Sequence, residues 1–307
     1  PRDIVARGIY NEVKEGRGSP HGGVFLDISH MPAEYVKRKL PSMYHQFKDL
    51  ADVDITKGPM EVGPTCHYIM GGINVHPETA ESSVPGLFAA GEAAAGMHGS
   101  NRLGGNSLSD LLVFGRRAGL YAAEYAKRVA KMPRIDDRQV DTAATGMLAP
   151  FERREGENPY AVHADLTGTM QELVGIIRTR AELEEAITRI GRLRERAMRV
   201  GVKGSRIYNP GWHLALDLLT MLTVSEAVAT AALMRQESRG GHTRDDFPKP
   251  DQEWGKKNVV VRRRDGQLVL KSEPLPEMPP ELRPLIGEDK PTGKVALEPV
   301  AAASAKE

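Results

Sequence analysis

The sequence contains a single cysteine, Cys66, in 307 residues. A disulfide framework is therefore excluded, and so are structural zinc and iron–sulfur sites built from several cysteines of this chain. The count also suits a protein of a reducing compartment. Lys and Arg total 42 and Asp and Glu total 41, which gives a net charge of +1. With so little excess charge we expect no nucleic-acid partner.

Long hydrophobic runs are scarce as well. No apolar run approaches the roughly 20 residues needed to cross a bilayer, so we expect no membrane span. The first residues, PRDIVARGIYNEVKEGRG, show neither a signal peptide nor an initiator Met. They begin inside a helical pattern, and we expect the chain to be the later part of a longer polypeptide. The length is sufficient for two domains with cores of their own.

The apolar periodicity predicts several helices and a few strands. The predicted helices are 3–15, 32–50 with a break at Pro41, 107–131, 167–178, 180–200 and 212–238, the last three forming an antiparallel bundle. The predicted strands are 23–29, 64–75 and 84–94, and a hairpin is predicted at 259–270 with its turn at Asp265-Gly266.

Local sequence signals predict how some of these elements begin and are joined. Thr179 with Glu182 has the pattern of a capping box, and Asn209-Pro210 is a favourable helix start. Residues 134–149 are expected to be a polar linker, and the tail after Glu273 is expected to be extended or disordered. The basic run 262–264 is interpreted as a solvated turn rather than an anion site.

The most informative segment is MHGSNRLGGNSLSDLLVFGRRAG at 97–119, a polar Gly-rich loop that leads into an apolar helix. The Gly104-Gly105 pair lets a ligand approach the backbone closely. Asn106 or Ser107 can cap the helix. The open N–H groups at the helix start favour negative charge. The segment therefore predicts that an anion site and a cofactor site share one turn.

With the Gly-Glu pair just upstream, this segment closely resembles the flavoprotein subunit of succinate dehydrogenase and fumarate reductase. Three further motifs match the family in its order. RDIVARGIYNEVKEGRG resembles the family's RDxV(A/S)RAI, PTCHYIMGGI resembles PTxHYxMGGI, and RQESRGGHTRDDFP at 235–248 resembles RxESRGAHxRxDFP. The residues of these motifs are most similar to those of actinobacterial succinate dehydrogenases. The resemblance runs from Arg2 to about Trp254.

The resemblance implies an α/β (α+β) flavoprotein fold that is only partly present. Residues 1–63 would be the end of the capping domain, 64–133 the returning part of the FAD-binding domain, 134–248 the helical domain and 249–307 a hairpin with an extended tail. The family's GxGxxG fingerprint, its flavin-linking histidine and further substrate ligands are expected in a missing N-terminal half. The isolated chain is not expected to hold FAD tightly, and its strands are expected to have an exposed edge.

The resemblance also implies an activity. The family interconverts succinate and fumarate by hydride transfer between the dicarboxylate and flavin N5. Its electrons pass through iron–sulfur and membrane-anchor subunits to quinone, which implies a place at the cytoplasmic side of the cell membrane, held there by partner subunits. Two alternatives stay open. One is L-aspartate oxidase, a soluble relative with a similar loop and helical domain, and the other is a non-catalytic helical module.

Three residues are expected to act on the substrate. Arg102 suits a carboxylate, because a guanidinium holds it by two parallel hydrogen bonds. By resemblance Arg102 and His67 bind the same dicarboxylate. Arg2 matches the family's proton-transfer arginine on the capping domain. Because the pKa of arginine lies above about 12, Arg2 would need a dry site and a proton relay.

The resemblance further implies a set of residues beside FAD: Gly91, Glu92, Asn106, Ser107 and Leu108. The Glu92 carboxylate would accept from ribose hydroxyls. The N–H groups of Ser107 and Leu108, at the positive end of a helix, would stabilise charge at the flavin N1/O2 edge.

Other polar residues near these motifs are interpreted as structural. His98 is either structural or at the border of the substrate. Five residues near the end of the helical domain are expected to form an ion-paired junction that fixes this domain to the core: Arg239, His242, Arg244, Asp245 and Asp246.

Overall fold

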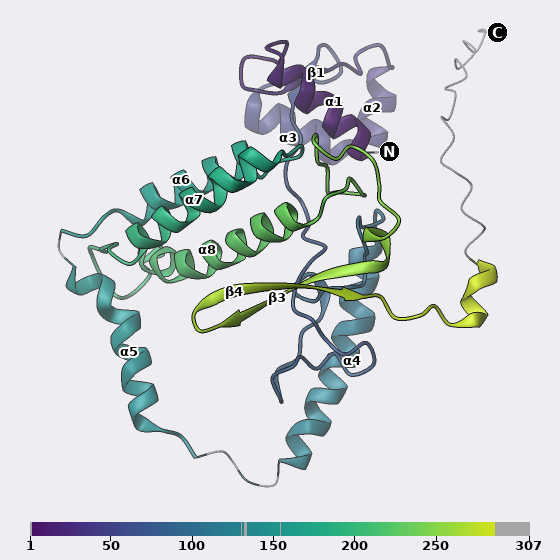
Figure 1. Cartoon of the computed structure of the whole chain (residues 1–307). Coiled ribbons are helices and arrows are strands. Elements are labelled where there is room, and N and C mark those ends of the chain that lie inside the picture. Colours follow the sequence, from purple (N-terminus) through teal and green to yellow (C-terminus); the bar gives the residue numbers. More distant parts are fainter. Residues whose placement is uncertain (1, 130, 132–133, 154, 286–307) are drawn as a thin grey trace.

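The computed structural model describes residues 2–285 except 130, 132, 133 and 154, and helices are its main secondary structure (Figure 1). The α-helices are α1 Arg2–Lys14, α2 Ala33–Lys39, α3 Pro41–Ala51, α4 Asn106–Arg128, α5 Asp137–Glu152, α6 Pro159–Leu173, α7 Arg180–Ala197 and α8 Pro210–Met234. The short 3-10 helices are η1 Gly91–Ala93, η2 Trp254–Lys256 and η3 Pro280–Leu285.

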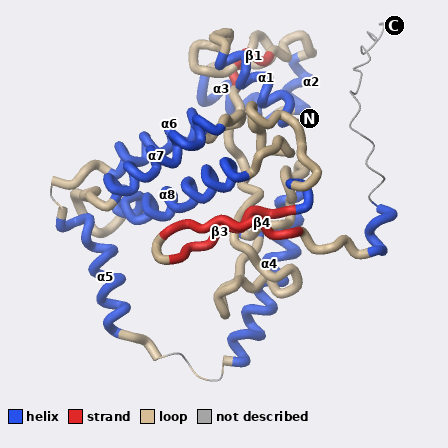
Figure 2. The backbone as a smooth tube through the Cα atoms, viewed as in Figure 1, coloured by secondary structure: helices blue, strands red, loops and turns tan. Residues whose placement is uncertain are grey.

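Strands are short and come in two antiparallel pairs (Figure 2). The first pair is β1 Val24–Leu26 with β2 Met60–Val62, and the second is β3 Lys257–Arg264 with β4 Gln267–Pro274. The hairpin β3–β4 was predicted and is confirmed. Its turn uses positive φ angles at Asp265 (49°) and Gly266 (81°), as the Asp-Gly pair indicates.

The main core lies between α6, α7 and α8, which pack against one another as the predicted bundle. Leu183 and Ile190 of α7 and Leu218 and Leu222 of α8 are fully buried there. Helix α6 begins earlier than its periodicity suggested. The Asn158 side chain accepts from the Tyr160 N–H, so this residue caps the helix just before a proline.

The predicted caps of the other two bundle helices are confirmed. The Thr179 side chain accepts from the Glu182 N–H, and the Glu182 side chain accepts from the Thr179 N–H. Asn209 accepts from the Trp212 N–H at the start of α8. Local chemistry thus fixes where these helices begin.

A second, small core lies in the first 62 residues and is formed by Val36, Ile55 and Met60. Pro41 separates α2 from α3, as predicted, because it cannot continue a helix from the preceding turn. The strand predicted at 23–29 is confirmed over three residues. Lys14 at the end of α1 approaches Glu182 of α7 at 3.8 Å.

The strands predicted at 64–75 and 84–94 are wrong. The structure has isolated bridges there, such as Ile73 with Ala94, and the 3-10 helix η1 covers the predicted strand end. A strand needs a neighbouring ladder, and in the described chain this region meets only single bridging residues. Beside it, α4 leaves Leu112 and Val113 more than half exposed.

Two further expectations are corrected. Residues 134–149 are not a linker, because α5 covers most of them. The Asp136 side chain accepts from the Arg138 N–H and caps this helix, and the three alanines that follow favour it. Helix α8 has the length and composition to cross a bilayer, contrary to the expectation from the sequence, but its buried stripe packs on α6 and α7.

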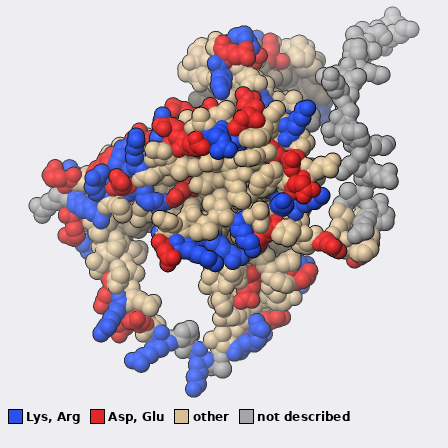
Figure 3. All heavy atoms as spheres, viewed as in Figure 1, with Lys and Arg blue, Asp and Glu red and all other residues tan. Residues whose placement is uncertain are grey.

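The outcome for the C-terminal region is mixed. Residues 280–285 form η3, whereas the predicted tail beyond 285 lies outside the described residues. Lys and Arg side chains gather over the hairpin β3–β4 (Figure 3). The basic run 262–264 is exposed, as expected, but it lies in strand β3 and not in a turn, because each of its residues pairs with a residue of β4. Arg262 lies 3.4 Å from Glu273.

Thr179→Ala removes one half of the capping box. We expect a loss of about 1 kcal/mol in the free energy of unfolding, because the Glu182 N–H loses its acceptor. Urea titration measures it. Thr188→Ala, at an exposed position inside the same helix, is the matched control, and an equal loss in both variants would contradict the role of the cap.

Candidate active site

The structure brings the segments of His67 and Arg102 together through Tyr68. The Arg102 guanidinium carbon lies 4.5 Å from the centre of the Tyr68 ring, and Tyr68 directly follows the exposed His67. Arg102 Nη1 also lies 3.3 Å from Ser107 Oγ and 3.4 Å from the Leu103 carbonyl. Arg102 is therefore held at the start of α4, on an aromatic surface.

Three polar side chains meet beneath this arginine. His98 Nε2 lies 3.2 Å from both the Tyr68 hydroxyl and Asp110 Oδ2, and the hydroxyl lies 3.5 Å from the same carboxylate oxygen. Burial raises the pKa of Tyr68, and the Asp110 carboxylate raises it further, so the phenol keeps its proton. Sequence reasoning missed Asp110, although an acid inside the apolar run LSDLLVF was a usable signal.

The predicted side-chain cap of α4 is wrong. The N-cap is Gly105 with φ 86°, and no side chain caps the helix. This left-handed backbone favours glycine and places Asn106 at the first helical position. The Leu108 N–H donates to the Gly105 carbonyl at 3.1 Å. Ser107 contributes its hydroxyl to Arg102 instead of a cap.

The loop before α4 has open space beside its two glycines, where a cofactor could approach the backbone. A Cβ built at Gly104 or Gly105 would meet no atom within 4 Å, so the backbone there borders open space. The 23-residue helix α4 begins at this point and directs its positive end toward the loop. These features suit the reducible, negatively charged edge of a flavin. The roles of Asn106, Ser107 and Leu108 beside it stay predictions.

Gly91 and Glu92 connect the neighbouring segments. Gly91 has φ 66°, and a Cβ there would lie 2.7 Å from the Leu111 side chain, so this glycine allows close approach to α4. Glu92 Oε1 accepts from the Ile69 N–H at 2.9 Å, which fixes the segment that carries His67. Their predicted contacts with FAD stay predictions.

Arg2 begins α1, but its side chain lies outside the described residues. Its predicted proton transfer therefore stays a prediction. Cys66, beside His67, is exposed as a free thiol. The described residues contain no cluster of three or more His, Cys, Asp or Glu side chains that could hold a metal ion.

The segment after α8 supports the arginine loop directly. The Gly241 N–H donates to the Ser100 carbonyl at 2.9 Å. Gly240 has φ 60°, and a Cβ on it would collide with the same carbonyl. The helical domain therefore contacts the loop two residues before Arg102.

A buried ion cluster holds this supporting segment. Arg244 is fully buried and donates to Asp246 at 2.8 and 2.6 Å, as well as to the Ala232 carbonyl at the end of α8. The predicted junction is confirmed for this pair. Arg239 pairs instead with Glu237 at 3.0 Å, a fully buried carboxylate that the sequence interpretation missed.

His242 is part of the same junction and is neutral. Its Nε2 lies 3.1 Å from the Arg235 carbonyl, and its Nδ1 lies 3.3 Å from Arg178 Nη1. Burial, together with the smaller effect of the Arg178, Arg235 and Arg244 charges, lowers its pKa from the ordinary 6.5 to about 4.

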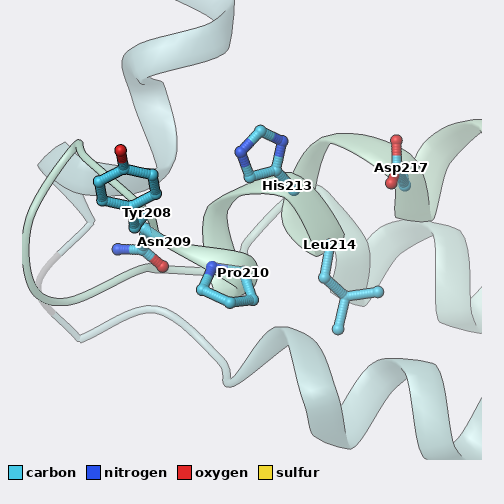
Figure 4. Close-up of a pocket in the computed structure, with 6 residues that line it drawn as sticks. All are labelled: Tyr208, Asn209, Pro210, His213, Leu214 and Asp217. Carbon is cyan, nitrogen blue, oxygen red and sulfur yellow. The ribbon is translucent and has the colours of Figure 1, made fainter.

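A surface pocket of about 500 Å³ lies elsewhere, at the N-terminal end of α8 (Figure 4). It is lined by Tyr208, Asn209, Pro210, His213, Leu214 and Asp217. Helix α8 has 25 residues and is therefore about 37 Å long, and the segment that contacts Ser100 follows its other end. This pocket is separate from the candidate site.

Gly240→Ala tests the contact with the loop. We expect it to lower the free energy of unfolding by clearly more than Gly266→Ala does. Both substitutions place alanine at a positive φ, which costs about 1–2 kcal/mol, but only the first collides with a carbonyl. Chemical unfolding of the two variants measures the difference. Equal losses would show that the Ser100 contact is unimportant.

The lowered pKa of His242 predicts that the free energy of unfolding depends on pH. Well above pH 6.5 its imidazole is neutral in the folded and unfolded states and contributes nothing. As the pH falls toward about 4, only the unfolded state takes up the proton, so the free energy of unfolding decreases. We expect a loss of roughly 2 kcal/mol between about pH 7 and pH 4.5 that His242→Gln removes.

Unfolding titrations at the two pH values measure this difference. His45→Gln, at an exposed position, is the control that should leave the pH dependence unchanged. A wild-type pH dependence that persists in His242→Gln would contradict the assignment.

Comparison with known proteins gives two matching family models. Residues 1–108 match an FAD binding domain, and residues 163–284 match the fumarate reductase flavoprotein C-terminal domain. The succinate dehydrogenase flavoprotein subunit of Coxiella burnetii is 36% identical over 302 residues, which are 92% of this chain and 51% of that protein. The fumarate reductase flavoprotein subunit of Mycobacterium tuberculosis is 37% identical over 280 residues, 87% of this chain and 48% of that protein.

A solved structure of Mycobacterium smegmatis Sdh1 in complex with UQ1 is 58% identical, with a TM-score of 0.85. The match covers 92% of this chain and 48% of that one. This agrees with the actinobacterial character of the motifs. The chain spans about half the length of the curated relatives it matches. The motifs, the fold and these matches together show that the chain belongs to the flavoprotein family of succinate dehydrogenase and fumarate reductase subunits.

Proposed function

We propose that this chain, as part of a complete flavoprotein subunit, interconverts succinate and fumarate with FAD. The observation that carries the proposal is the Arg102 guanidinium, held at the start of α4 over the ring of Tyr68, the residue that follows His67. A small dianion needs fixed cations and hydrogen-bond donors, and this arrangement supplies both.

The chemistry divides between cofactor and protein. FAD supplies the hydride acceptor at N5 when it is bound. Arg102 grips one carboxylate with parallel N–H donors, and His67 donates to the same substrate, which fixes the carbon chain of the dicarboxylate. Arg2 holds and transfers the proton from the capping domain. The Tyr68 ring excludes water from one face of the Arg102 guanidinium.

Other residues of the chain border the cofactor in this proposal. Glu92 accepts from the ribose, while Gly91 and Asn106 lie beside the flavin. The Ser107 and Leu108 region, with the positive end of α4, favours the negative charge of the reduced ring. The exposed apolar side chains of α4 are covered by the other half of the same subunit.

The expected partner subunits are those that take electrons from the reduced flavin. The electrons leave the flavin for an iron–sulfur subunit, and membrane-anchor subunits hold the protein at the cytoplasmic side of the membrane. The relatives' names and the Sdh1 complex with UQ1 support this proposal over L-aspartate oxidase. A non-catalytic role for the helical module would not explain why the Arg102 guanidinium is held over the Tyr68 ring.

Arg102→Lys and His67→Gln test the proposal in the complete holoenzyme. We expect Arg102→Lys to lower kcat/KM for succinate about 100-fold, because lysine keeps the charge but loses the paired donors. His67→Gln should lower it about 10-fold by weakening one charge-assisted hydrogen bond. Steady-state kinetics at matched flavin content measure both effects.

Arg263→Lys, at an exposed position of strand β3, is the control and should not change turnover. Unchanged turnover in both site variants would instead favour the non-catalytic module.

A further inference from the structure

The Asp110 carboxylate is buried beside the Tyr68 hydroxyl, and the Tyr68 ring carries Arg102. It lies in the second turn of α4 and is 3% exposed. A buried carboxylate is costly unless it is paired or hydrogen-bonded. Among the described residues its Oδ2 lies 3.2 Å from His98 Nε2, and its Oδ1 has no hydrogen-bond partner. Such a group calls for a functional explanation.

Asp110 and His98 hold one end of the Tyr68 ring. The Tyr68 hydroxyl lies within 3.5 Å of the Asp110 carboxylate and 3.2 Å of His98 Nε2. The His98 ring also meets the Tyr68 ring edge to face, with centres 5.3 Å apart. The backbone beside the ring is held by the bond from the Ile69 N–H to Glu92. The ring is therefore fixed at both ends.

The fixed ring in turn carries Arg102. The guanidinium lies over the face of Tyr68, and its Nε is buried without a hydrogen-bond partner among the described residues. The hydrogen bonds that hold its Nη1, to Ser107 and Leu103, are long at 3.3 and 3.4 Å. The aromatic surface therefore contributes much of what orients this arginine.

We propose that Asp110 is a positioning residue for dicarboxylate binding, which acts on Arg102 through Tyr68 and His98. This inference rests on the proposed function of Arg102. Asp110 sets the orientation of the Tyr68 ring, and the ring sets the plane in which the guanidinium meets a carboxylate. Loss of the Asp110 carboxylate leaves the positive charge of Arg102 in place but makes the orientation of its guanidinium less fixed. Affinity for the dicarboxylate therefore falls while the flavin stays bound.

A double-mutant cycle tests the proposal in the complete holoenzyme. The probe is malonate, a dicarboxylate that has no CH–CH bond to oxidise, and its Kd is read from the flavin difference spectrum. We expect Asp110→Asn to weaken malonate binding about 10-fold, and Tyr68→Phe, which keeps the ring, to weaken it similarly. The double variant should be no weaker than either single variant, because both act through one contact.

The kinetics provide a second readout that a general structural role would not give. In Asp110→Asn the KM for succinate should rise about 10-fold, while kcat changes less than twofold. Glu124→Gln removes a carboxylate from an exposed position of the same helix and is the matched control. If Asp110→Asn does not retain flavin, Tyr68→Phe and His98→Gln carry the test, with the same expected rise in the malonate Kd.

Different outcomes overturn different claims. Additive losses in the double variant, or a malonate Kd unchanged in Asp110→Asn or in the two substitute variants, would overturn the positioning role. If Arg102→Lys still weakens malonate in that case, the proposed function stands. A wild-type holoenzyme that neither binds malonate nor is reduced by succinate would instead overturn the proposed function.

Discussion

The buried ion cluster after α8 is the interaction on which the candidate site depends. Glu237 is fully buried and is held ionised: burial alone would raise its pKa, but hydrogen bonds from Arg239, the Asp251 N–H and Arg235 lower it below the ordinary value. Removing one partner of such a pair costs far more than an exposed salt bridge, about 3–5 kcal/mol. The cluster fixes the segment that contacts Ser100, so the helical domain determines where the arginine loop lies.

The loop itself has little core of its own and depends on contacts from outside. Gly241 contacts it from the helical domain, and Tyr68 carries Arg102 from the segment of His67. The largest core of the described residues lies in the α6–α8 bundle instead. A binding loop on a rigid support is a common arrangement, because the support sets the geometry while the loop stays accessible.

Local chemistry made much of the fold predictable from the sequence. The capping box at Thr179, the Asn209-Pro210 helix start, the break at Pro41 and the Asp265-Gly266 turn each depend on neighbouring residues alone, and each was confirmed. The family motifs likewise marked the segments of His67 and Arg102, which the structure brings together.

What the sequence could not show depends on contacts between distant segments. Whether 64–75 forms a strand depends on neighbours that periodicity cannot supply. Asp110 meets Tyr68 across 42 positions of the chain, so no local pattern reveals their contact. The cap of α4 was mispredicted because a left-handed glycine, Gly105, replaced the expected side chain.

In the proposed function, this chain forms part of a site that oxidises a dicarboxylate with FAD. Anaerobic addition of succinate to the complete, purified flavoprotein tests it most directly, with visible flavin absorbance as the readout. We expect succinate to bleach the flavin and fumarate to restore its colour. A flavin that stays oxidised with succinate but is bleached by L-aspartate would overturn the proposed substrate.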